Sequence, residues 1–249
     1  MTESTEHRDK KIRVEDKYKL LYWPGLPGRG EPVRLAFEEA GADYEDVANC
    51  EKDGIKVLLK AKEACNAFAP PMLQHGDLML SQTPNIMLYL GPRLKLVPET
   101  EEGRLLVNQY FLTASDCQNE AHDTHHPISV MDYYEDQKDA ALAKAKSFRA
   151  TRIPKFFKHF ESVLSKGKGE WLVGDDVTYA DLMLFHLVDG LKYAFPRRMK
   201  KLEPEFPKVF GVHERVAQRP RIAAYLKSDR RQKYGDGIYR YYEELDGDE

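Results

Sequence analysis

The segment at residues 71–83, which reads PMLQHGDLMLSQT, decides the fold that we predict for the N-terminal part of the chain. Two short apolar runs flank a turn that contains Gly76, and this pattern predicts a β-hairpin. A helix should follow directly, because Thr83 suits its N-cap and Pro84 suits its first position, where a missing amide hydrogen costs nothing. The free amides of such a helix start either serve capping alone or hold a carboxylate, and the local sequence leaves both interpretations open.

The residues upstream of the hairpin alternate between strand and helix patterns. A strand-like run at 18–23 is stopped by the proline- and glycine-rich loop at 24–28. An apolar stripe at 33–40 then predicts a helix, which Gly41 should end. The loop at 24–28 therefore joins a strand to a helix.

Two weaker patterns complete this part of the chain. A second strand is expected at 44–47, and one helix within the lysine-rich segment 51–68. Residues 17–96 therefore alternate as β-α-β-α-β-β-α, which is typical of a small α/β domain. The polar and turn-prone residues 97–103 are the predicted linker.

Nearly everything beyond the linker has helical spacing, so we expect an all-helical domain at 104–235 between the linker and a C-terminal tail at 236–249. Thr178 and Asp181 can exchange hydrogen bonds with each other's backbone amides, which is a capping box with Asp in place of the usual Glu. We assign this box a structural role, the start of a buried helix. The helices are expected at 104–126, at 137–164 with an interruption at Pro154, from Tyr179 onward, at 207–218 and at 221–227.

Composition excludes several classes of protein. The net charge of -3 leaves no basic excess for a nucleic-acid partner. No apolar run approaches the roughly 18 residues of a membrane span, and the polar residues 1–16, an expected disordered tail, carry no secretory signal. Three scattered cysteines are too few for a disulfide framework or a zinc site. We therefore expect a cytoplasmic protein with no metal, no membrane contact and no nucleic acid.

Three motifs together resemble the cytosolic glutathione transferases. The segment 71–83 resembles the cis-proline, hairpin and Gln-Ser/Thr segment of that family, and 174–181 resembles the capping box and hydrophobic staple of its helical domain. The stretch 22–34 resembles the tyrosine-type active-site loop of the sigma, alpha, mu and pi classes. The motifs stand in the right order and spacing, and the resemblance covers about residues 17–230. It implies an α/β plus all-α protein: a thioredoxin-like domain followed by a helical glutathione-transferase domain.

The resemblance also assigns residues to a glutathione site. Pro71 should be cis, and residue 70, here Pro70, should present its backbone to the peptide part of glutathione. Gln82 and Thr83 should bind the γ-glutamyl carboxylate through side chain and amides.

Two further assignments concern the ends of glutathione. Asp116 matches an acidic residue that reaches the γ-glutamyl amine of the neighbouring subunit in a homodimer, although a solvated helix face would look the same. Lys60 or Lys62 is the nearest candidate for the glycyl carboxylate, and either one is also compatible with an ordinary surface lysine.

Tyr22 is the proposed catalytic residue. The thiol of glutathione has a pKa near the roughly 8.5 of free cysteine, so little of it is thiolate at neutral pH. A phenol hydroxyl that points at the sulfur stabilises the anion by about 1.5–3 kcal/mol, which lowers the thiol pKa by roughly one to two units. Arg29 is expected to add positive potential. The alternative is that Tyr22 merely ends a buried strand.

Two departures from the family pattern concern the same site. Between Tyr22 and Gly28 the loop has one residue more than the tyrosine classes. Pro70 has no N–H, whereas the family uses both backbone groups of this residue to pair with the cysteinyl moiety. We therefore predict that glutathione binds more weakly than in a typical relative, by about 1 kcal/mol at most.

A polar cluster at 122–126, HDTHH, allows three interpretations: a metal site, a lining of the second-substrate cleft, or a polar helix end broken by Pro127. We place His126 in that cleft together with Tyr133 and Tyr134, which would suit an apolar electrophile. Tyrosines 239, 241 and 242 either fold over the cleft or pack on the core.

The sequence thus predicts a glutathione transferase that conjugates glutathione thiolate to apolar electrophiles or reduces organic hydroperoxides. The alternative on the same scaffold is a protein that holds glutathione or an apolar ligand without turnover.

Overall fold

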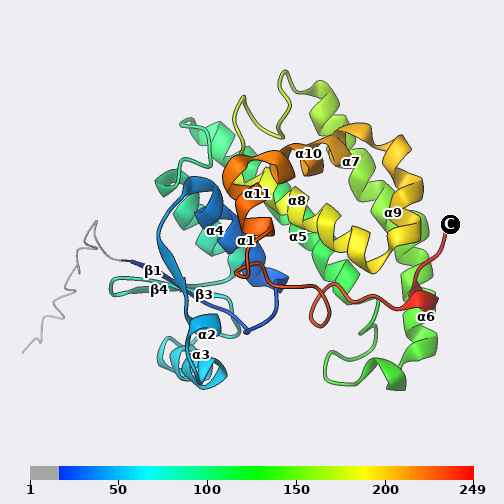
Figure 1. Ribbon diagram of the computed structural model, residues 1–249. Coiled ribbons are helices and arrows are strands. Elements are labelled where there is room, and N and C mark those ends of the chain that lie inside the picture. Colours follow the sequence, from blue (N-terminus) through cyan, green and yellow to red (C-terminus); the bar gives the residue numbers. More distant parts are fainter. Residues whose placement is uncertain (1–16) are drawn as a thin grey trace, which may run out of the picture.

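The computed structural model describes residues 17–249 (Figure 1); the tail predicted at 1–16 lies outside the described residues. A four-stranded sheet has the order β2-β1-β3-β4. β1 pairs with β2 in parallel and with β3 antiparallel, and β3 and β4 form the predicted hairpin around Gly76. The strands are β1 Tyr18–Leu21, β2 Tyr44–Asp46, β3 Met72–His75 and β4 Leu78–Ser81.

Alternation along the strands divides the core into two parts. Leu20 and Leu73 point into the large core that contains helices α1 and α4 and most of the helical part. Leu21 and Met72, their neighbours in sequence, point to a small cluster with α2 and α3. Figure 1 shows the same layering, with α2 and α3 on the side of the sheet away from the other helices. The helices of this part are α1 Glu31–Ala40, α2 Val47–Cys50, α3 Gly54–Ala64 and α4 Thr83–Arg93.

Helices make up most of the remaining chain up to residue 226. α8 is buried nearly all round and packs against α5, α10 and α1, so it joins the helical part to the sheet part. The helices are α5 Glu101–His122, α6 Lys138–Ser147, α7 Ile153–Lys166, α8 Tyr179–Ala194, α9 Pro196–Leu202, α10 Pro207–Gln218 and α11 Pro220–Leu226.

This order confirms the predicted fold class of a mixed sheet domain followed by helices. α5 begins at Glu101, inside the segment predicted as a linker. We propose two domains at 17–96 and 104–235, joined by 97–103, with 236–249 as a C-terminal tail.

Several predicted elements need correction. The lysine-rich segment 51–68 contains one helix, α3, as predicted, but an additional short helix, α2, lies before it and follows β2 directly. The helix predicted at 137–164 is two helices separated by a π-helical turn at Phe148–Arg152, and Pro154 lies in the first turn of α7, where its missing N–H leaves no bond unmade. The short helix α9 was not predicted.

The capping box is confirmed. The carboxylate of Asp181 accepts hydrogen bonds from the backbone N–H of Thr178 at 2.8 Å and from its hydroxyl at 2.7 Å. It also accepts the N–H of Leu172 at 2.8 Å, so one buried carboxylate fixes both the start of α8 and the loop before it. Burial raises the pKa of Asp181 to about 6, and these hydrogen bonds oppose the rise.

The C-terminal segment packs along the helical part. Tyr239 is 1 % exposed and lies against Gly190 of α8, whereas Tyr241 remains 45 % exposed. Further along, the carboxylate of Asp246 accepts the backbone N–H of Arg197 at 2.8 Å, and Arg149 binds the carbonyl of Leu245. In Figure 1 this red segment crosses the helical part from α8 toward α6.

Candidate functional site

Tyr22 lies directly after β1 and is 5 % exposed. Its hydroxyl oxygen accepts a hydrogen bond from the backbone N–H of Arg29 at 2.9 Å. Two glycines make room for the ring: a Cβ on Gly30 would lie 2.7 Å from Cγ of Tyr22, and one on Gly28 would overlap its hydroxyl oxygen. Burial raises the pKa of Tyr22, while the Arg29 N–H and the charges of Arg29 and Arg34 oppose the rise. The group is therefore a neutral phenol at physiological pH.

The loop that follows Tyr22 is held by side chains from three helices. Arg34 of α1 donates to the carbonyls of Leu26 and Pro27 at 3.1 and 3.2 Å. His186 of α8 lies 3.0 Å from the carbonyl oxygen of Gly28 through Nε2, and the hydroxyl of Thr83 donates to the carbonyl of Arg29 at 2.9 Å. Each carbonyl from residue 26 to residue 29 thus has a side-chain partner, which fixes the loop in one conformation.

A buried group of charges underlies this loop. The guanidinium of Arg34 is 0 % exposed and pairs with Glu31 at 3.2 Å and with Asp46 at 2.6 Å. Glu31 also accepts the hydroxyl of Tyr225 at 2.9 Å and pairs with Arg231, both from the C-terminal part of the chain. Because a buried charge without a partner is costly, loss of any member should displace the others.

The peptide bond between Pro70 and Pro71 is cis, as predicted, and both residues are buried immediately before β3. Gln82 is exposed and has a positive φ of 71°. It is the N-cap of α4, so the helix begins one residue earlier than predicted. Thr83 was expected to cap this helix and does not, because its hydroxyl is bonded to the carbonyl of Arg29. A carboxylate at this helix start would therefore meet backbone amides rather than the Thr83 hydroxyl.

Arg29 is exposed, and its guanidinium points to the helical part of the chain. It donates to the side-chain oxygen of Asn119 on α5 at 2.9 Å. Asp116 lies on the same helix and is exposed, whereas Lys60 is an exposed residue of α3. The structure thus links Tyr22, Arg29 and Thr83 through one loop, while Lys60 lies on a different element.

The polar cluster at the end of α5 consists of three imidazole rings. The ring centroids of His122, His125 and His126 lie 4.7–5.2 Å from one another. Burial lowers the pKa of all three, that of His125 to about 3. Within residues 17–249 no group of three or more His, Cys, Asp and Glu side chains is arranged to hold a metal ion.

The two tyrosines that we placed beside His126 differ in their surroundings. Tyr133 is 77 % exposed. Tyr134 is buried under Tyr242, with ring centroids 3.9 Å apart, and its hydroxyl donates to Glu244 at 2.9 Å. The C-terminal segment thus covers one member of the predicted cleft and leaves the other open.

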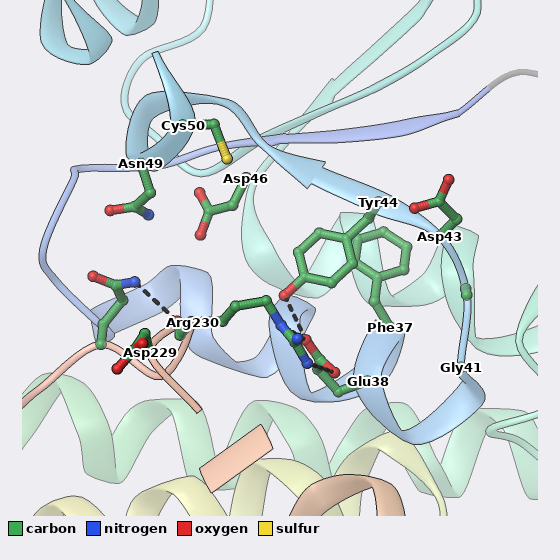
Figure 2. A pocket seen from close by; sticks show the side chains of 12 residues that line it. Phe37, Glu38, Gly41, Asp43, Tyr44, Asp46, Asn49, Cys50, Asp229 and Arg230 are labelled. Atoms are coloured by element: carbon green, nitrogen blue, oxygen red, sulfur yellow. Dashed lines mark hydrogen bonds and ion pairs between the residues drawn. The ribbon is translucent and has the colours of Figure 1, made fainter. Parts of the chain in front are cut away.

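Two hollows lie near the sheet. One of about 820 Å³ is lined by α1, β2, α2 and residues 229–232, and none of the predicted site residues lines it (Figure 2). In that view Arg230 reaches Glu38, which also accepts the hydroxyl of Tyr44 at 3.1 Å. A second hollow of about 880 Å³ lies between the loop at Pro24 and α3, and Lys60 lines it.

Two residues of the site, His186 and Asn119, were not predicted from the sequence. The signal for His186 was a single imidazole in the long apolar run that follows the capping box. Asn119 had no such signal, because a polar residue on a partly exposed helix is ordinary.

A mixed four-stranded sheet with a cis-proline before β3 is joined to an all-helical part, which is the arrangement that the resemblance predicts. Residues 122–229 match the family described as glutathione S-transferase, C-terminal domain. These matches confirm the resemblance predicted from the motifs and support a glutathione transferase enzyme.

Relatives over most of the chain support this conclusion. A glutathione S-transferase of Plasmodium falciparum is 26 % identical over 86 % of this chain and 98 % of its own length. Glutathione S-transferase P 1 of Xenopus laevis is 28 % identical over 87 % of this chain and 94 % of its own. The solved structure of NaGST-2 superposes with a TM-score of 0.66 at 26 % identity, covering 88 % of this chain and 99 % of that one. As a separate finding, no helix within residues 17–249 is long and apolar enough to cross a membrane.

Proposed function

We propose that the chain conjugates glutathione to apolar electrophiles and that Tyr22 activates the thiol. The observation that carries this proposal is the direction of one hydrogen bond. The Tyr22 oxygen accepts the N–H of Arg29, so the phenol's own proton is left to donate to a sulfur. Within the described residues, no hydrogen bond donated by that hydroxyl is found.

The energetics of this contact are sufficient for activation. A hydrogen bond to a charged acceptor contributes about 1.5–3 kcal/mol, which corresponds to a fall of roughly one to two units in the pKa of the thiol. The positive charges of Arg29 and Arg34, which already act on Tyr22, would favour the thiolate in the same way.

The proposed contacts with glutathione come from three other parts of the chain. Backbone amides at the start of α4, next to Gln82 and Thr83, would hold the γ-glutamyl carboxylate, and the dipole of an 11-residue helix favours an anion there. The backbone of Pro70 before Pro71 would face the cysteinyl part through its carbonyl alone. Lys60, beside a hollow, is the proposed partner of the glycyl carboxylate.

The proposal includes a homodimer in which Asp116 serves the neighbouring subunit. Leu105, Leu112 and Asp116 fall within about 40° of one another around α5, given 3.6 residues per turn. The two leucines are 64 % and 41 % exposed. An exposed apolar stripe that continues into an acidic residue is what such an interface requires.

The second substrate is proposed to bind beside His126 and Tyr133, near the end of α5 that Arg29 contacts, whereas the third predicted member, Tyr134, is covered by Tyr242. Hydroperoxide reduction is a second activity that the same thiolate would support. The proposed compartment is the cytoplasm, where reduced glutathione and the free cysteines of this chain are compatible.

Turnover of a dinitrohalobenzene by wild type and Tyr22→Phe tests the proposal. We expect kcat/KM to fall by at least tenfold in the variant, with a smaller change in KM for glutathione. Equal rates would remove Tyr22 from the mechanism. No rate in either protein would favour a non-catalytic glutathione- or ligand-binding protein, an alternative that the missing N–H of Pro70 supports.

A further inference from the structure

One peptide unit connects Tyr22 to the helical part of the protein. The N–H of Arg29 donates to the Tyr22 hydroxyl at 2.9 Å. The carbonyl on the other side of the same peptide unit, that of Gly28, lies 3.0 Å from Nε2 of His186. A carbonyl oxygen only accepts, so Nε2 of His186 carries a proton and donates it. The two bonds form a continuous chain: His186 to the Gly28–Arg29 peptide to Tyr22.

The imidazole of His186 is a neutral hydrogen-bond donor. It is 0 % exposed, and burial lowers its pKa to about 4, so the imidazole is uncharged at neutral pH. With the proton on Nε2, the other nitrogen is bare, and it faces the hydroxyl of Tyr234 at 3.5 Å. That hydroxyl donates to Asp189 at 2.9 Å, and the ring of Tyr239 packs edge-on against the imidazole with centroids 5.3 Å apart. The Gly28 carbonyl fixes the tautomer, and the contacts with Tyr234 and Tyr239 hold the ring in place.

We propose that His186 is a positioning residue for the thiol activation, acting on Tyr22 through the Gly28–Arg29 peptide. This inference rests on the proposed role of Tyr22 and goes beyond it, because it assigns part of the activation to a residue of the helical part. In this proposal His186 acts through the peptide and does not contact glutathione or its sulfur.

Two physical effects give His186 this role. Hydrogen bonds in a chain polarise one another, so a donor on the carbonyl strengthens the N–H of the same trans peptide as a donor. A stronger bond from Arg29 withdraws charge from the Tyr22 oxygen and makes the phenol a better donor to the thiolate. The bond also fixes where the peptide stands, and a shift of a few tenths of an ångström would loosen its contact with Tyr22.

The test measures the pKa of the thiol of bound glutathione by ultraviolet difference absorbance. His186→Leu removes the donor, whereas the amide nitrogen of His186→Gln can reach the position of Nε2 and keep it. Each substitution is also made in the Tyr22→Phe background. We expect His186→Leu to raise the thiol pKa by about half a unit, a roughly threefold loss of thiolate. His186→Gln should keep the wild-type value, and neither substitution should matter once Tyr22 is Phe.

A matched control exists in His125, which is 1 % exposed and bonds the carbonyl of Ile238 through Nε2 at 2.9 Å. His125→Leu should destabilise the fold and leave the thiol pKa unchanged. Nitrogen chemical shifts of wild type give a readout that needs no variant, since they must show the His186 proton on Nε2.

Three results would overturn the inference: equal shifts in His186→Leu and His186→Gln, the same shift in the Tyr22→Phe background, or a proton on Nδ1 of His186. If Tyr22→Phe alone leaves the thiol pKa unchanged, the proposed role of Tyr22 itself fails. If Tyr22→Phe shifts that pKa and His186→Leu does not, only the role of His186 fails.

Discussion

Replacement of Gly28 by alanine should damage the site more than the fold. Gly28 has a φ of +41°, and an added Cβ would overlap the hydroxyl oxygen of Tyr22. The backbone strain costs roughly 1–2 kcal/mol and the overlap roughly 1–3 kcal/mol more, unless the loop moves away. Movement of the loop breaks the 2.9 Å bond from Arg29 to Tyr22, so the strain is relieved at the expense of the proposed catalytic contact.

Gly25 in the same loop supplies the matched control. Its φ is +75°, yet no non-neighbouring atom of residues 17–249 lies within 4 Å of an added Cβ. Gly25→Ala should therefore lose only the roughly 1–2 kcal/mol of backbone strain in urea unfolding and keep its conjugation rate. Gly28→Ala should lower the free energy of unfolding by about 2–5 kcal/mol, or by a smaller amount together with at least a tenfold fall in kcat/KM. Similar stabilities and similar rates in the two variants would refute the packing argument.

Two further predictions concern acid stability and glutathione affinity. The pKa of His186 is about 6.5 in the unfolded chain and about 4 in the folded protein, so between these pH values the unfolded state binds more protons. The free energy of unfolding therefore falls as the pH falls from 6.5 to 4. This residue should account for a loss of stability on the order of 3 kcal/mol. In urea titrations from pH 6.5 to 4, His186→Gln should remove that part of the dependence of the unfolding free energy on pH, and an unchanged dependence would contradict the prediction. Pro70→Ala restores an N–H beside the cysteinyl position and should tighten glutathione binding up to about fivefold in calorimetry, whereas an unchanged Kd would show that this bond does not matter.

Local sequence patterns predicted the structural features that depend on residues close together in the chain. The capping box depends on Thr178 and Asp181, three residues apart, and the hairpin depends on Gly76 between two apolar runs, so both were readable from the sequence. The start of α4 was misplaced by one residue because the Thr83 hydroxyl bonds the carbonyl of Arg29, a partner 54 residues away.

In the candidate site, too, the sequence predicted features within one short stretch and missed contacts between distant residues. Tyr22 and the glycines of its loop stand within one short stretch, which a motif can describe. His186 meets Gly28 across 158 positions, and nothing in the apolar run around His186 indicates which carbonyl it will reach. Contacts of this kind depend on how α8 packs on α1, and no local pattern determines that packing.

The most direct test of the account is the pKa of the thiol of glutathione bound to wild type and to Tyr22→Phe. The hydrogen bond from Tyr22 should hold the wild-type value roughly one to two units below the roughly 8.5 of a free thiol, and Tyr22→Phe should return most of that difference while glutathione still binds. The same thiol pKa in both proteins would contradict the claim that Tyr22 activates glutathione.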